Sequence, residues 1–217
     1  MGSAPRSAGL ATKMGAQMSP TVFVVDDDAE MRTALCDLLA LHDHTVAAFA
    51  DAAAFLAVAA TRPAGCLVLD VGMPGIDGLA VQQRVGDAAL PVIFLTGRAD
   101  IPTSVRAMKA GAYEYLTKPV DAAALLVAVD GALALDRTRR AAAGERARLI
   151  AAHATLTDRE RVIMAQAVAG RLNKLIAGDL GLSEISVKVS RGRLMRKLGA
   201  TSIAELVRIS ERLRDRG

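Results

Sequence analysis

Aromatic side chains are scarce in this 217-residue chain, which has no tryptophan, two tyrosines and four phenylalanines. Proteins that hold single-stranded nucleic acid by stacking bases on aromatic rings need more such residues, so we do not expect that mode of binding. Cysteine is rarer still, with two residues. Cys36 and Cys66 lie in apolar runs and outside any CxxC pair, and we interpret both as reduced core thiols rather than as disulfide or zinc ligands.

Long hydrophobic runs are absent too, because no window reaches the roughly 18 uninterrupted apolar residues that a membrane-spanning helix needs. The first twenty residues carry only Arg6 and Lys13 as charges and lack the apolar centre of a secretion signal. We therefore expect a cytoplasmic protein with no membrane contact, and we interpret residues 1–20 as a disordered or artificially added lead.

Charge is divided unequally along the chain, although its net value is only +4. Residues 21–130 carry 7 Lys and Arg against 14 Asp and Glu, a net charge of −7. Residues 156–217 carry 13 against 7, a net charge of +6. With 52% hydrophobic residues, the chain can form a packed core. We expect an acidic domain suited to a cation or phosphoryl group, followed by a basic domain suited to a polyanion.

Short apolar strand patterns alternate with helical patterns in the first part of the chain. The expected strands are 21–25, 45–49, 66–69, 92–95 and 113–116, and a helical pattern follows each. This alternation predicts an α/β domain with a five-stranded, doubly wound parallel sheet of the flavodoxin-like kind. In such sheets the functional loops lie at the carboxyl ends of the strands, so the site is expected there.

Polar side chains follow these expected strands. Asp26, Asp27 and Asp28 come after the first strand, Asp70 after the third, Thr96 after the fourth and Lys118 after the fifth. Clustered carboxylates repel one another unless a hard divalent cation neutralises them, which predicts a Mg²⁺ site. With charge offset by the metal and Lys118, Asp70 is the candidate nucleophile towards a phosphoryl group, and the Thr96 hydroxyl can bond a phosphoryl oxygen.

Each of these residues has a simpler interpretation when it is taken alone. Asp28 suits the N-cap of the following helix, Asp70 a turn before Pro74, and Lys118 a solvated loop. Capping does not account for three successive acids, and the combined pattern therefore favours a site.

A helical pattern that begins near Asp121 loses apolar residues and gains charge as it proceeds. We expect one long helix that leaves the first domain and forms a helical linker over residues 135–155. Gly144 is expected to mark a break or bend in this helix. We interpret Arg137, Arg139 and Arg140 as a solvated face, with contact to DNA phosphates as the alternative.

Capping signals divide residues 156–217 into four predicted helices, which makes this second domain all-α. Thr157 with Glu160 and Ser202 with Glu205 have the spacing of capping boxes at the starts of the first and last of these helices. These capping boxes predict where the first and last helices start more closely than hydrophobic periodicity alone does.

The two middle helices form a predicted helix-turn-helix: residues 173–180, a turn at Gly181, and residues 184–198. The second of them carries five Lys or Arg residues, and a basic helix of this kind fits the major groove of double-stranded DNA. A charged solvated face is the alternative. The side chains expected in the core are Leu175, Ile176, Leu180, Leu182, Val187, Leu194 and Leu198.

Four segments of the first domain resemble the receiver domain of bacterial two-component response regulators over residues 21–134. They are VVDDD at 24–28, DVGMPGIDG at 70–78, FLTG at 94–97 and KAGAYEYLTKP at 109–119. The resemblance implies that Asp26, Asp27 and Asp70 bind Mg²⁺ and that Asp70 accepts phosphate from a sensor histidine kinase.

The same resemblance implies roles for three further residues and for one face of the domain. Thr96 and Lys118 would contact the phosphoryl group, and Tyr115 would be an aromatic switch, for which an ordinary strand aromatic is the alternative. Dimerisation would use the face formed by the fourth helix and the fifth strand.

Residues 156–208 of the second domain resemble the DNA-binding domain of NarL/LuxR-type regulators. The matching segments are LTDRE at 156–160, NKLIA at 173–177 and VKVSR at 187–191. Together with the receiver, RLMRKLGA at 193–200 makes the chain most similar to the FixJ-like branch. The DNA contacts that the resemblance implies are Lys174, Ser186, Lys188, Val189, Ser190, Arg191, Arg193 and Lys197.

Two positions of the predicted recognition helix depart from that branch. Ser190 stands where histidine is common, and Ile185 stands where a basic or polar residue is usual. Base readout is therefore expected to differ from that of relatives.

The sequence predicts a regulator in which phosphorylation of Asp70 controls dimerisation or domain release, and hence transcription. A sensor histidine kinase, double-stranded DNA, a second copy of the chain and RNA polymerase are the expected partners. Three alternatives stay open: DNA binding independent of phosphate, a phosphohydrolase with an aspartyl intermediate, and a phosphate sink without specific DNA binding. We favour a regulator over an enzyme, because the helix-turn-helix has no role in ester hydrolysis.

Overall fold

The computed structural model describes residues 19–61, 63–73, 78–86, 90–97 and 101–214. The lead expected over residues 1–20 lies outside them except for Ser19 and Pro20. The chain forms two compact units, residues 1–138 and 139–217. Within the described ranges, no helix is both long enough and apolar enough to cross a membrane.

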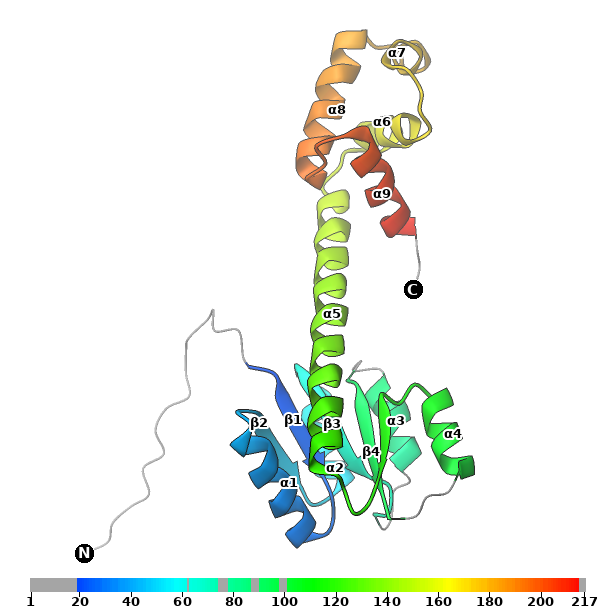
Figure 1. The fold of residues 1–217 in the computed structure, drawn as a ribbon. Helices are drawn as coiled ribbons and strands as arrows, with labels where there is room; N and C mark the ends of the chain where they lie inside the picture. Colours follow the sequence, from blue (N-terminus) through cyan, green and yellow to red (C-terminus); the bar gives the residue numbers. More distant parts are fainter. Residues whose placement is uncertain (1–18, 62, 74–77, 87–89, 98–100, 215–217) are drawn as a thin grey trace, which may run out of the picture. The chain divides into compact units, whose positions relative to one another are not determined.

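The first unit is built on one parallel sheet (Figure 1). Its strands are β1 (Thr21–Val25), β2 (Thr45–Phe49), β3 (Gly65–Asp70), β4 (Val92–Thr96) and β5 (Glu114–Thr117), in the order β2-β1-β3-β4-β5. Its helices are α1 (Ala29–Leu41), α2 (Ala52–Ala59), α3 (Gly78–Gly86), α4 (Ile101–Lys109) and the first part of α5 (Ala122–Ala154). The predicted doubly wound α/β domain is confirmed.

Alternating side chains of the strands form two cores, one on each face of the sheet. In β1, Phe23 and Val25 pack with residues of α2, α3 and α4, whereas Val22 and Val24 pack with residues of α1 and α5. Because both faces are covered, the strands are almost continuously apolar rather than alternating with polar residues. This arrangement leaves the carboxyl edge of the sheet as the place where polar side chains gather.

The two cysteines differ in their surroundings. Cys66 lies in the core, as predicted, and burial together with Asp136 and Asp130 raises the pKa of its thiol to about 12. Cys36 is only half-buried on α1, so its assignment to the core is wrong. Both thiols are free.

Helix α5 is fixed to the first unit by two close contacts. The buried carboxylate of Asp136 accepts a hydrogen bond of 2.9 Å from the backbone N–H of Gly65, the first residue of β3. Five residues earlier along α5, Gly131 leaves the space that the Tyr113 hydroxyl occupies, because a Cβ there would lie 2.0 Å from that oxygen. These contacts hold α5, which covers one face of the sheet, near the amino ends of β3 and β5.

The break predicted at Gly144 is wrong, because α5 is helical throughout Ala122–Ala154. A glycine in a helix interior costs only about 1 kcal/mol relative to alanine. Leu133 is buried in the core of the first unit, and Leu149 is buried in the core of the second. Packing of both parts of the helix outweighs the low helix propensity of one exposed residue.

The second unit contains the end of α5 and four shorter helices, as predicted. These are α6 (Asp158–Val168), α7 (Asn173–Leu180), α8 (Glu184–Leu198) and α9 (Ile203–Arg214). At the start of α6 the capping box of Thr157 and Glu160 is complete. The second predicted box is half formed: Ser202 accepts from the Glu205 backbone, but the Glu205 side chain bonds the backbone and hydroxyl of Thr201 at 2.8 Å each.

The core of the second unit contains most of the leucines and valines expected there. Ile176, Val187, Leu194 and Leu198 are buried, and Leu180 and Leu182 are partly buried against them. The expectation for Leu175 is wrong, since 52% of this residue is exposed. Helix α7 has only eight residues, and Ile176 and Ala177 already form its buried face.

Candidate functional site

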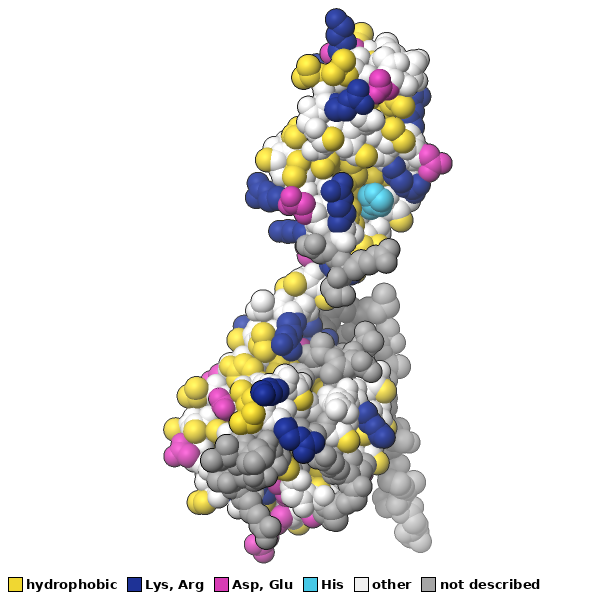
Figure 2. Space-filling view, turned by 90° about the vertical axis from the view of Figure 1, so that its right-hand side faces the viewer, with side chains coloured by type: hydrophobic (Ala, Val, Ile, Leu, Met, Phe, Trp, Pro, Cys, Tyr) yellow, Lys and Arg dark blue, Asp and Glu magenta, His cyan; other side chains and the backbone are white. Residues whose placement is uncertain are grey.

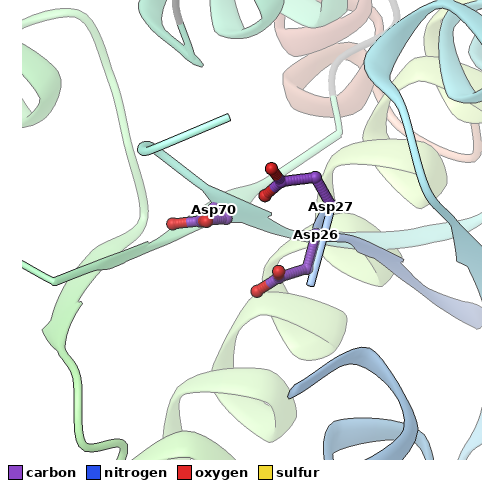
Figure 3. Close-up of side chains that lie close together, drawn as sticks. All are labelled: Asp26, Asp27 and Asp70. Carbon is purple, nitrogen blue, oxygen red and sulfur yellow. The ribbon is translucent and has the colours of Figure 1, made fainter. Parts of the chain in front are cut away.

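Three carboxylates meet at the carboxyl edge of the sheet. Asp26 directly follows β1, and Asp70 is the last residue of the neighbouring strand β3 (Figure 3). Carboxylate oxygens of Asp26, Asp27 and Asp70 lie within 4.8 Å of one another. Asp26 and Asp70 are buried, whereas Asp27 is exposed, so the cluster opens to solvent on one side.

Backbone groups hold the two buried carboxylates in place. The N–H of Asp28 donates to Asp26 Oδ1 at 2.9 Å, and the N–H of Gly72 donates to Asp70 Oδ1 at 3.1 Å. Asp28 also caps α1, accepting from the N–H groups of Glu30 and Met31, as its simpler interpretation predicted. The side chain of Asp28 therefore caps α1, while the side chains of Asp26 and Asp27 belong to the carboxylate cluster.

Lys118 joins the two buried carboxylates. Its Nζ lies 2.9 Å from Asp26 Oδ2 and 3.2 Å from Asp70 Oδ2. Burial alone lowers the pKa of Lys118, but the hydrogen bonds to Asp26 and Asp70 outweigh it, and the pKa lies above its ordinary value. One ammonium offsets only one of three negative charges. The remaining hard oxygen donors fit a small divalent cation such as Mg²⁺.

Sequence reasoning missed Arg32, which fixes the backbone of this loop. Its Nη1 donates to the carbonyl oxygen of Asp26 at 2.7 Å and to that of Asp27 at 3.4 Å. The signal was present in the sequence, because Arg32 lies one helical turn after the N-cap Asp28 and so projects towards the strand end. Arg32 orients the acid pair without contacting its carboxylates.

Thr96 and Tyr115 lie on the strands beyond Asp70. Thr96 is the last residue of β4, is buried, and accepts through its carbonyl oxygen from the N–H of Lys118 at 2.6 Å. Tyr115 on β5 is half-buried, with its ring centroid 6.2 Å from that of Phe94. Residues 74–77 of the DVGMPGIDG segment lie outside the described residues.

The second candidate site is the outer face of α8. Gly181 adopts a left-handed conformation that turns the chain from α7 to α8, and Ser183 caps α8 by accepting from the N–H of Ser186. Lys188, Val189 and Arg193 are exposed on α8, and Lys174 is exposed on α7. Ser186, Ser190 and Arg191 are half-buried.

Two of the predicted DNA contacts have partners inside the unit. Lys197 Nζ lies 2.6 Å from Glu160 Oε2 and 3.0 Å from the carbonyl oxygen of Thr155, and Arg191 donates to Asn173 Oδ1. Lys197 thus supports the capping box of α6. By contrast, neither Lys188 nor Arg193 makes an ion pair with any residue that the structure describes.

Comparison with known proteins identifies both units. Residues 22–130 match the family described as response regulator receiver domain, and residues 154–210 match the bacterial regulatory proteins of the luxR family. The matched ranges contain the carboxylate cluster and α8, respectively.

Several relatives are similar over most of the chain. Nodulation protein W of Bradyrhizobium diazoefficiens is 43% identical over 88% of this chain and 86% of its own length. Transcriptional regulatory protein FixJ of the same species is 36% identical over 88% of this chain and 94% of its own. Among solved structures, response regulator StyR has a TM-score of 0.81 at 42% identity, covering 89% of this chain and 98% of that one.

Proposed function

Since the chain belongs to the two-component response regulators that join a receiver domain to a LuxR-type DNA-binding domain, we propose that phosphorylation of Asp70 controls its binding to double-stranded DNA. The observation that carries the proposal is the buried carboxylate of Asp70 beside Asp26, Asp27 and Lys118. A sensor histidine kinase is the proposed donor: its N–P bond breaks as an O–P bond forms to a carboxylate oxygen of Asp70.

Each residue of the cluster has a proposed role in this transfer. Asp26, Asp27 and Asp70 would hold Mg²⁺, which when bound neutralises negative charge at the site. The Lys118 ammonium and the Thr96 hydroxyl would bond phosphoryl oxygens once Asp70 is modified. Tyr115 would change its packing against Phe94 in response, which is its proposed switch role.

The proposed consequence is a shift between two populations of the chain. Phosphate changes activity only by the free energy that it contributes differently to the two states. Val105 and Met108 on α4 are 44% and 46% exposed, which supports a dimer through the face of α4 and β5. Release of one domain from the other is the second possible readout, and RNA polymerase is the proposed partner of the DNA-bound form.

The matched ranges, residues 22–130 and 154–210, support the proposed domain limits. The receiver comprises residues 21–134, the linker residues 135–155 and the DNA-binding domain residues 156–217. Helix α5 therefore belongs to the receiver and to the linker, and Leu149 in its linker part contributes to the core of the second unit.

Phosphoryl transfer and assembly are tested together on the full chain. Wild type and Asp70→Asn are incubated with Mg²⁺ and a small phosphodonor, then examined by intact mass and by light scattering. We expect one added phosphoryl group in wild type alone, and a molar mass that rises towards a dimer if phosphate drives assembly. No phosphorylation of wild type, or equal phosphorylation of the variant, contradicts the role of Asp70. If wild type is phosphorylated but its molar mass by light scattering does not change, domain release is the favoured readout.

A further inference from the structure

Helix α8 exposes an apolar stripe that the core does not use. Ile185 is 76% exposed and Val189 is 47% exposed, and the two lie one helical turn apart. Gly192 continues the stripe by another turn. The buried face of the helix, formed by Val187, Leu194 and Leu198, lies on the opposite side, so no residue of this unit's core covers the stripe.

Basic side chains border this stripe. Lys188 and Arg193 are exposed on its two sides, and Arg196 is exposed beyond Gly192. Figure 2 views the second unit from the side of α6, α7 and α9, and it shows exposed Lys and Arg side chains among hydrophobic ones there as well. An apolar strip one residue wide between cations does not resemble a protein interface, whose centre is depleted of charge. It matches a DNA groove, which has bases in the middle and phosphates on both walls.

We propose that Ile185 and Val189 select thymine by contacting its C5-methyl group in the major groove. The proposal rests on the proposed function, namely that α8 enters double-stranded DNA. The thymine methyl group is the apolar feature that base pairs present in the major groove, and among the four standard bases only thymine carries it. An isoleucine at position 185 cannot accept or donate hydrogen bonds, so apolar contact is the readout open to it.

Gly192 complements these two side chains by leaving space on the same face. Among the described residues, a Cβ at Gly192 would meet only Arg196 Nη1, at 3.7 Å, so their packing does not require glycine there. Glycine in a helix interior lowers stability, and its presence on this face allows the backbone of α8 to approach the bases closely. Gly192→Ala is therefore expected to raise the thermal unfolding midpoint and to weaken binding to the specific site.

The test removes the thymine methyl group from the DNA in one set of measurements, and the Ile185 or Val189 side chain from the protein in another. The full chain, with Mg²⁺ and beryllofluoride, selects its site from random double-stranded DNA, and the site is then resynthesised with deoxyuridine in place of each thymidine. We expect one or two substitutions per half-site to weaken binding about fourfold, the value of one buried methyl group. In Ile185→Ala and in Val189→Ala, deoxyuridine at one of these thymidine positions should no longer weaken binding.

Val162→Ala is the matched control, because Val162 is 43% exposed and lies on α6 rather than α8. Circular dichroism melting shows whether each variant folds. If no site is enriched and all sequences bind alike, the proposed function is contradicted. If a site is enriched but deoxyuridine has no effect, or the effect persists in both α8 variants, the methyl contact is contradicted while specific DNA binding stands.

Discussion

At the scale of single residues, Lys118 is the cation that offsets the negative charges of Asp26 and Asp70. Its side chain is 18% exposed and the side chain of Asp26 is 1% exposed, so the ion pair is largely removed from water. Removing one partner of a fully buried pair costs about 3–5 kcal/mol, because an uncompensated charge is left behind. Some solvent reaches Lys118, and the expected cost is therefore smaller.

We predict that Lys118→Met lowers the free energy of unfolding by about 2 kcal/mol without Mg²⁺. The loss should shrink in millimolar Mg²⁺, because a bound cation would then offset the charges of Asp26 and Asp70. Urea unfolding followed by circular dichroism, in EDTA and in Mg²⁺, measures both. Lys109→Met is the control, since Lys109 is exposed at the end of α4. An equal loss in both solutions would contradict the expectation that a bound cation takes over the charge compensation by Lys118.

Glu160 makes the free energy of unfolding of the second unit depend on pH in the acidic range. The Lys197 ammonium and the Thr157 backbone N–H hold the pKa of Glu160 below its ordinary value. A lowered pKa means that this carboxylate stabilises the fold above its unfolded pKa of about 4.3, and that the contribution is lost as the pH falls through the folded pKa.

We predict that Glu160→Gln lowers the free energy of unfolding at pH 6 and that its deficit relative to wild type narrows towards about pH 3. Urea unfolding of the full chain across this range measures the difference, with Glu211→Gln on the exposed side of α9 as control. A deficit that stays constant with pH would mean that the charge of Glu160 does not matter.

At the scale of elements, local signals determined where helices begin, and tertiary packing determined where they continue. The bounds predicted for α7 and α8 match the structure because Gly181, Ser183 and Gly199 act on adjacent backbone groups. The break at Gly144 was wrong because packing by distant residues is not visible in a local pattern. Leu175 was misplaced for a related reason: apolar character does not say which side of a short helix is covered.

Two glycines on α5 should respond oppositely to alanine. Gly131→Ala is predicted to destabilise the first unit by about 1–3 kcal/mol, because the new Cβ would overlap the Tyr113 hydroxyl. Gly144→Ala is predicted to stabilise α5 by up to about 1 kcal/mol, because no described atom lies within 4 Å of its Cβ position. Thermal unfolding compares the two. A change in unfolding temperature of the same sign for both variants would contradict the packing of Tyr113 on α5.

For the molecule as a whole, the division of charge indicated two functions before any fold was known. The carboxylate cluster could be predicted, because parallel strands bring Asp26 and Asp70 to one edge of the sheet. The structural partners of Lys197 and Arg191 could not, since they depend on how α6, α7 and α8 pack. Resemblance assigned both residues to DNA, and their partners within the unit leave Lys188 and Arg193 as the more available cations.

The central claim is that a phosphoryl group on Asp70 controls DNA binding by the second unit. Its most direct test is the affinity of the full chain for its selected DNA site, measured by fluorescence anisotropy in Mg²⁺ with and without beryllofluoride, for wild type and Asp70→Ala. We predict that beryllofluoride raises the affinity of wild type and leaves that of Asp70→Ala unchanged. Unchanged affinity in wild type, or an equal increase in both proteins, would contradict the account.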